Sequence, residues 1–144
     1  IRAVLGNLVK TANKIDDTLE NFKDSVENGI MRALFSPEVE EIKLADHLFT
    51  QSVPYTHHGI YVGNNRVIHY AQDGDRISIK EDSLEIFADG KKIHRKSEEE
   101  SPLSYSREEA VSRAYRRFAE KEYNLVINNC ENFVRWCRNG TKNS

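Results

Sequence analysis

Apolar residues recur at alternating spacings of four and three along the first part of the chain, the pattern of a helix with a heptad seam. The seam consists of Ile1, Leu5, Leu8, Ala12, Ile15, Leu19, Phe22 and Val26. It breaks near Gly29, and Ser36-Pro37 ends the element because proline cannot continue a helix. We therefore predict a long N-terminal amphipathic helix in a segment 1–40, followed by a separate domain over 41–144. The pattern leaves open whether the seam packs on the protein's own core or forms a homodimer through residues 1–30.

Short β-type runs replace the helical pattern from residue 43 onward. Candidate strands cover residues 47–51, 56–63, 66–71, 76–80 and 91–95. Proline, glycine and asparagine-rich turns separate them, at Ser52-Val53-Pro54, Asn64-Asn65 and Asp73-Gly74. This arrangement predicts an antiparallel sheet.

Two helices follow the strands. Ser106 and Glu109 have the spacing of a capping box, which starts a helix that runs to about residue 121. A last helix covers 130–139, with Asn129 as its N-cap and Gly140 just beyond its end. Strands followed by helices that cover the sheet make an α+β fold.

Charge and composition exclude several classes of partner. The 144 residues include 21 Lys plus Arg and 23 Asp plus Glu, a formal net charge of −2. This balance gives no long-range attraction to nucleic acid. No stretch approaches the roughly 18–20 apolar residues of a membrane span, and no secretory signal opens the sequence. Contact with a membrane is therefore expected to be peripheral.

The chain contains two cysteines, Cys130 and Cys137. On one helix they lie about 10.5 Å apart along the axis, too far for a disulfide. Free thiols indicate a reducing compartment, so we expect a cytoplasmic protein.

Cys130 has the position of a nucleophile. It lies in the first turn of the last helix, on the same stripe as Phe133, Val134 and Cys137. The helix dipole is expected to lower the thiol pKa there, and the free N–H groups of that turn can hold an oxyanion. Cys137, two turns further on, is expected only to pack.

Two histidines are candidates for the base. In the strand over 56–63, His57 and Gly59 share one face, and His58 lies on the other. A two-residue turn at Asn64-Asn65 puts His57 and His69 on opposite faces, whereas a three-residue loop or a bulge pairs Gly59 with His69 and brings both imidazoles to one face. We predict the second arrangement, with an Asn or Gly at positive φ.

The histidines and Cys130 also have the residue types of a metal site. A zinc site formed by His57, His69 and Cys130 has suitable ligand types but lacks a fourth ligand, so we expect no metal and no cofactor. His47 and His94 have no surrounding constellation and are expected to be structural.

Two runs resemble a known family. THHGIYVGNNRVIHYA, residues 56–71, and NNCENFVRWCRNG, residues 128–140, resemble the lecithin–retinol acyltransferase domain family, which includes phospholipid acyltransferases and phospholipases with H-box and NC motifs. The resemblance spans residues 43–140. It implies a permuted papain-like fold of the NlpC type, in which the sheet packs against the nucleophile-bearing helix. The sequence departs from the family pattern at His58, where an aromatic residue is common, and at Asn132, where many members have His.

The resemblance also implies roles. Cys130 corresponds to the nucleophile, His57 to the general base and acid, and His69 to the residue that orients His57, while Tyr55 or Asn129 helps to hold the oxyanion. The implied reaction transfers an acyl group, usually from a phospholipid, to the cysteine as a thioester and then to water, an amine or an alcohol. Two alternatives stay open: a cysteine amidase or peptidase with the same triad, and a non-catalytic module that dimerises through its N-terminal helix.

Overall fold

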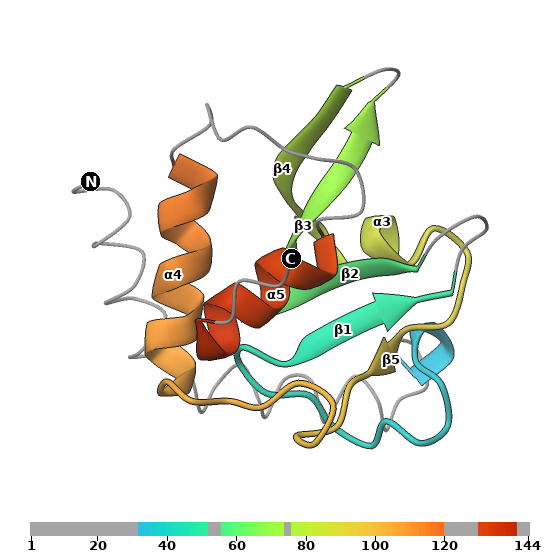
Figure 1. Ribbon diagram of the computed structural model, residues 1–144. Coiled ribbons are helices and arrows are strands. Elements are labelled where there is room, and N and C mark those ends of the chain that lie inside the picture. Colours follow the sequence, from blue (N-terminus) through green and yellow to red (C-terminus); the bar gives the residue numbers. More distant parts are fainter. Residues whose placement is uncertain (1–31, 52–55, 74–75, 120–129, 141–144) are drawn as a thin grey trace.

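The computed structural model describes residues 32–51, 56–73, 76–119 and 130–140, without the side chains of residues 32, 72, 73 and 76. Its centre is a five-stranded antiparallel sheet in the order β4-β3-β2-β1-β5 (Figure 1). The strands are β1 (His47–Thr50), β2 (His57–Gly63), β3 (Arg66–Asp73), β4 (Arg76–Ser83) and β5 (His94–Arg95). The predicted antiparallel sheet is confirmed. The predicted fourth strand was three residues too short, and the fifth was three residues too long.

Short and long helices accompany the sheet. They are η1 (Arg32–Leu34), α3 (Leu84–Ala88), α4 (Arg107–Ala119) and α5 (Cys130–Asn139). As predicted, the Ser106 hydroxyl accepts from the Glu109 amide at 3.0 Å, and Gly140 follows α5 at φ 76°. The predicted N-terminal helix and its heptad seam, residues 1–31, lie outside the described residues, as does the predicted N-cap Asn129.

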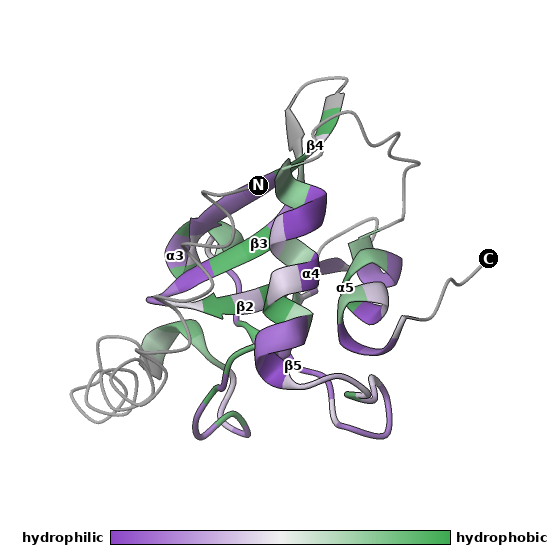
Figure 2. Cartoon of the chain, turned by 90° about the vertical axis from the view of Figure 1, so that its left-hand side faces the viewer, coloured by the Kyte–Doolittle hydropathy of each residue, from purple (hydrophilic) through white to green (hydrophobic). Residues whose placement is uncertain are grey.

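The helices cover the two faces of the sheet. Figure 2 shows α3 on one side and α4 with α5 on the other. The α4–α5 side buries one apolar cluster, whose members on β2 and β3 are Ile60, Val62, Ile68 and Tyr70. The α3 side buries a second cluster, which includes Tyr61, Val67 and Phe87. Because strand residues alternate between faces, His58 belongs to the α5 side and His57 to the α3 side.

The β2–β3 hairpin has the register predicted from the histidines. Gly59 pairs with His69 and Tyr61 with Val67, and the register shifts between Tyr61 and Gly63. The connection is a two-residue turn of Asn64 and Asn65, at φ 53° and 60°, next to a bulge. Both asparagines tolerate the left-handed conformation that this turn requires. The bulge supplies the extra residue that keeps His57 and His69 on one face.

Gly59 makes that face possible. A Cβ at this position would lie 2.5 Å from the Val67 side chain and 2.8 Å from the Phe87 ring. It would also lie 3.2 Å from the His69 Cβ. The absence of a side chain therefore leaves room for the two imidazoles and the ring that covers them.

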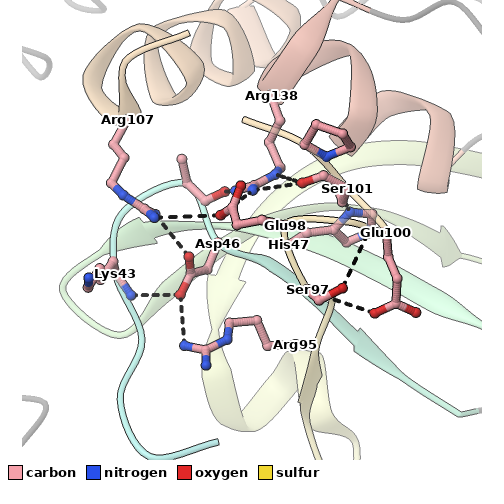
Figure 3. Close-up of polar contacts among 12 residues, drawn as sticks. Lys43, Asp46, His47, Arg95, Ser97, Glu98, Glu100, Ser101, Arg107 and Arg138 are labelled. Atoms are coloured by element: carbon pink, nitrogen blue, oxygen red, sulfur yellow. Dashed lines mark hydrogen bonds and ion pairs between the residues drawn. The ribbon is translucent and has the colours of Figure 1, made fainter. Parts of the chain in front are cut away.

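A buried arginine joins the end of α5 to the loops beside β1 (Figure 3). Arg138 is 1% exposed and donates to the Ser101 carbonyl at 2.8 and 3.1 Å. It also donates to the carbonyl of Ala45, a buried residue with φ 71°. Asp46, next along the chain, accepts from Arg107 of α4 at 2.9 Å. These contacts fix the strained entry to β1 against both helices.

We expect Arg138→Met to lower the free energy of unfolding by about 3 kcal/mol, because it leaves the buried Ser101 and Ala45 carbonyls without their donor. Urea denaturation followed by circular dichroism measures the change. Arg116→Met is the control, since Arg116 is half exposed and forms an ion pair with Glu109 at the surface of α4; this substitution should cost less than about 1 kcal/mol. Equal losses from the two variants would show that Arg138 does not have this structural role.

Candidate active site

Cys130 is the first residue of α5, and its thiol lies against the beginning of β2. The Sγ atom is 3.6 Å from the carbonyl oxygen of Thr56. Burial raises the pKa of the Cys130 thiol, while backbone hydrogen bonds at His58, Glu131 and Cys130 oppose that rise. The net direction is upward, so the prediction of a lowered pKa was wrong. Desolvation of the sulfur outweighs the helix N-terminus here.

The Cys130 thiol lies at the β3-facing edge of β2, in the part of that edge where β3 does not pair with β2. Both backbone polar groups of Tyr61 point toward the β1 side: its amide donates to the Asp46 carbonyl, and its carbonyl accepts from the Ala45 amide. By alternation, the Thr56 carbonyl and the His58 amide point to the opposite edge, where pairing with β3 begins only at Gly59. In Figure 1 the β3–β4 hairpin bends away from β2 in this region. Cys130 therefore lies beside the backbone of His57, although α5 packs on the opposite face of the sheet from the His57 side chain.

His57 and His69 are brought together, and a carboxylate extends the pair. His57 Nε2 lies 2.7 Å from His69 Nδ1, and His69 Nε2 lies 2.8 Å from Asp82 Oδ2. The Phe87 ring packs against both imidazoles, at centroid distances of 5.0 and 5.4 Å. Sequence reasoning missed Asp82 because the predicted fourth strand stopped at residue 80. Asp82 lies two residues beyond Lys80, the cross-strand partner of His69, and so falls on the same face.

The direction of these hydrogen bonds fixes the tautomer of His57. The Asp82 carboxylate only accepts, so His69 carries its proton on Nε2 and presents Nδ1 as an acceptor. His57 then donates from Nε2, which leaves a lone pair on its Nδ1. Burial is the main cause that lowers the pKa of His57 to about 4, followed by the neighbouring His69. His57 is therefore neutral near pH 7, with its unprotonated nitrogen on the side of the ring nearer the backbone.

The comparison with known proteins identifies the family. Residues 40–143 match the family model described as lecithin retinol acyltransferase. The chain belongs to the lecithin retinol acyltransferase family.

Curated members of this family are about 30% identical to the chain. The rat lecithin retinol acyltransferase is 30% identical over 132 residues, and the human protein is 31% identical over 132 residues. Each alignment covers 72% of this chain and 57% of the relative. The bovine protein is 30% identical over 135 residues, with the same coverage. The chain thus spans a little over half the length of these family members.

A cavity of about 460 Å³ opens beside Cys130 in this lecithin retinol acyltransferase-family chain. Its lining residues are Phe49, Gln51, Thr56, His58, Lys96, Cys130 and Glu131. The cavity thus lies on the face of His58 rather than that of His57. Lys96 and Glu131 give it one cationic and one anionic group.

A second chain of polar groups ends at this cavity. His58 Nδ1 lies 2.8 Å from His47 Nε2, and His47 Nδ1 lies 2.7 Å from Ser101 Oγ. All three residues are buried. The expectation that His47 has no constellation around it was wrong. His47 of β1 pairs with Ile60 of β2 and thereby lies next to His58 on the same face. His94, in contrast, lies with its Nδ1 3.1 Å from a carboxylate oxygen of the exposed Glu38.

Two predicted oxyanion residues, Tyr55 and Asn129, lie outside the described residues. Within the described ranges, no three His, Cys, Asp or Glu side chains form a group that could hold a metal ion. In the same ranges, no helix is long and apolar enough to span a membrane.

Proposed function

We propose that this protein is a lipid acyltransferase in which Cys130 attacks an acyl ester and holds the acyl group as a thioester. The observation that carries this proposal is the series of hydrogen bonds that runs from Asp82 through His69 to His57. These hydrogen bonds leave the lone pair of His57 on Nδ1, a nitrogen that lies beside the backbone against which the Cys130 thiol packs. The names of the curated relatives support lecithin, a phospholipid, as the class of acyl donor.

The first half of the proposed reaction consumes the donor ester. The raised thiol pKa and the lowered His57 pKa make the resting pair neutral, so attack and proton transfer occur together. The Cys130 sulfur bonds to the carbonyl carbon while its proton moves to His57 Nδ1. The ester C–O bond then breaks, and His57 returns the proton to the leaving alcohol oxygen. His69 and Asp82 stabilise the transient imidazolium.

The developing oxyanion needs donors near the sulfur. The first turn of α5 offers backbone N–H groups that have no partner within the helix, and Cys130 is the first residue of that turn. Tyr55 or Asn129 is a further candidate donor. We infer peripheral contact with a lipid surface, because the donor is a membrane component. A homodimer through residues 1–30 is a separate hypothesis.

Intact-protein mass spectrometry tests the proposal. Incubation of the protein with vesicles of a phosphatidylcholine of defined acyl chains should add the mass of one acyl group, and peptide mapping should place it on Cys130. Neutral hydroxylamine should remove the adduct, as expected of a thioester. Cys137 is an internal control, since it is fully buried and its pKa is raised by burial.

An alternative result would favour the hypothesis that the protein is a cysteine amidase or peptidase. A protein that forms no adduct with lipid, but is labelled on Cys130 by an amide or peptide substrate analogue, would contradict a lipid donor. A protein labelled by neither class would contradict acyl transfer itself.

A further inference from the structure

The cavity beside Cys130 has polar walls. Among the described residues that line it, Phe49 is the only one with a hydrocarbon side chain. The Phe49 ring is already covered, because the His58 and His94 rings stack on it at centroid distances of 5.8 and 5.1 Å. An acyl chain needs apolar surface around it, which this cavity does not offer in its described part. The cavity therefore fits the polar end of an acyl donor rather than its hydrocarbon end.

The anionic residue of the cavity is compensated by groups of the protein itself. Glu131 Oε2 accepts two hydrogen bonds from Arg135, of 2.7 and 3.1 Å. Glu131 Oε1 lies 3.7 Å from His58 Nε2, and a neutral His58 with its proton on Nε2 faces that oxygen with a donor. Both carboxylate oxygens thus have partners within the protein.

The cationic residue, Lys96, is held in place but keeps donors for a ligand. Its amide donates to the His47 carbonyl at 2.9 Å, which fixes its backbone beside β1. Its Nζ lies 4.8 Å from the centre of the Phe49 ring and 3.7 Å from the carboxylate of Glu100, a side chain that is 55% exposed. An ammonium group has three N–H donors, and an exposed ion pair contributes less than about 1 kcal/mol. An anion can therefore replace Glu100 beside Lys96 at small cost.

We propose that this cavity binds the head group of the phospholipid donor, with the Lys96 ammonium paired to the phosphodiester. This inference rests on the proposed function, because it places the donor that Cys130 attacks. In a glycerophospholipid the phosphate and the acyl esters are attached to one glycerol, only a few covalent bonds apart. A phosphate bound to Lys96 therefore holds a donor ester near the sulfur, which lines the same cavity. In this arrangement Lys96 selects acyl donors that carry a phosphate.

Two acyl donors separate head-group binding from the reactivity of Cys130. One is a defined phosphatidylcholine in mixed micelles with a neutral detergent, and the other is p-nitrophenyl hexanoate, an activated ester without a phosphate. Rapid-quench mass spectrometry follows formation of the acyl adduct on Cys130 over a range of concentrations of each donor.

Lys96→Gln should affect only the phospholipid. We expect its kcat/KM for adduct formation from phosphatidylcholine to fall ~10- to 100-fold, as for the loss of one charge-assisted hydrogen bond. The loss should appear mainly as a higher concentration at half-saturation, because the phosphate takes no part in bond breaking. Adduct formation from p-nitrophenyl hexanoate should stay within ~3-fold of wild type, since that donor has no group for Lys96 to bind.

Three further variants keep the test sharp. Lys96→Arg retains a cation that binds phosphate and should keep use of phosphatidylcholine within ~5-fold of wild type. Lys96→Met retains an apolar stem against Phe49 and should behave as Lys96→Gln does, which covers the case in which the glutamine variant does not fold. Lys43→Gln is the matched control for loss of one positive charge: Lys43 is exposed and does not line the cavity, so both donors should react as with wild type.

The outcomes distinguish this inference from the function on which it rests. Normal use of phosphatidylcholine by Lys96→Gln and Lys96→Met, equal losses with the two donors, or a loss in Lys96→Arg as large as that in Lys96→Gln would overturn the head-group site while leaving the thioester mechanism intact. Absence of any adduct in the wild-type protein with either donor would overturn the proposed function, and this inference with it.

Discussion

Cys130→Ala is expected to abolish acyl transfer from phosphatidylcholine, with a loss of roughly 10⁴- to 10⁶-fold, while the protein stays folded. No other described residue can supply the nucleophile at this edge of β2, since among the described residues the only second thiol, Cys137, is buried two turns along α5. Losses of this size are typical when a covalent nucleophile is removed and only binding and oxyanion contacts remain. Release of radiolabelled fatty acid, together with a thermal melt, measures both parts of the expectation.

Cys137→Ala is the matched control on the same helix, and it should lower stability while leaving acyl transfer nearly unchanged. The Cys137 side chain is 0% exposed within the cluster between α4, α5 and the sheet. Its truncation should lower the free energy of unfolding by about 1 to 2 kcal/mol and change the acyl-transfer rate by less than ~3-fold. Comparable activity in Cys130→Ala, or a loss of activity in Cys137→Ala at a temperature where it is folded, would contradict the assignment of the nucleophile.

The register of the β2–β3 hairpin could be predicted because it depends on local chemistry. Alternation along β2 fixes which residues share a face with His57, and asparagines at positive φ permit the tight turn. The capping pattern at Ser106 and the glycine after α5 are equally local signals, and both helix ends lie where they predict. Such features depend on residues only a few positions apart, so one sequence suffices to find them.

The features that sequence reasoning missed depend on burial and on distant strands. The thiol pKa rises because the surroundings desolvate the sulfur, and no local pattern reports how deeply α5 is packed. His47 meets His58 only because β1 and β2 pair in one particular register. The choice of face for α5 is likewise a property of the packed sheet. The raised thiol pKa changes the expected resting state of Cys130 and His57 from an ion pair to a neutral pair. The strand register and the packing of α5 place His58, rather than His57, in the wall of the cavity.

Asp82→Asn is expected to lower the rate of acyl uptake by roughly 10³- to 10⁴-fold with little change in the free energy of unfolding. The wild-type carboxylate accepts from His69 Nε2, and this choice is what leaves the lone pair on His57 Nδ1. An introduced amide can donate to His69 Nε2 instead, which reverses both hydrogen bonds and places the His57 proton on Nδ1, where it blocks the base. In the serine protease triad, the same Asp-to-Asn change costs about 10⁴-fold for this reason. The measurement is the rate of adduct formation on Cys130 at saturating vesicle concentration.

Glu85→Gln provides the control for loss of one negative charge near Asp82. Glu85 is exposed in the first turn of α3, close along the chain to β4, but it makes no contact with either imidazole in the described structure. Its removal should leave adduct formation within ~2-fold of wild type, because an exposed charge is screened by solvent. Equal rates for Asp82→Asn and wild type would mean that an amide oxygen can accept from His69 as well as the carboxylate does. The tautomer of His57 would then be fixed by something other than the charge at position 82. The series of hydrogen bonds from Asp82 to His57 would no longer explain why His57 is the base.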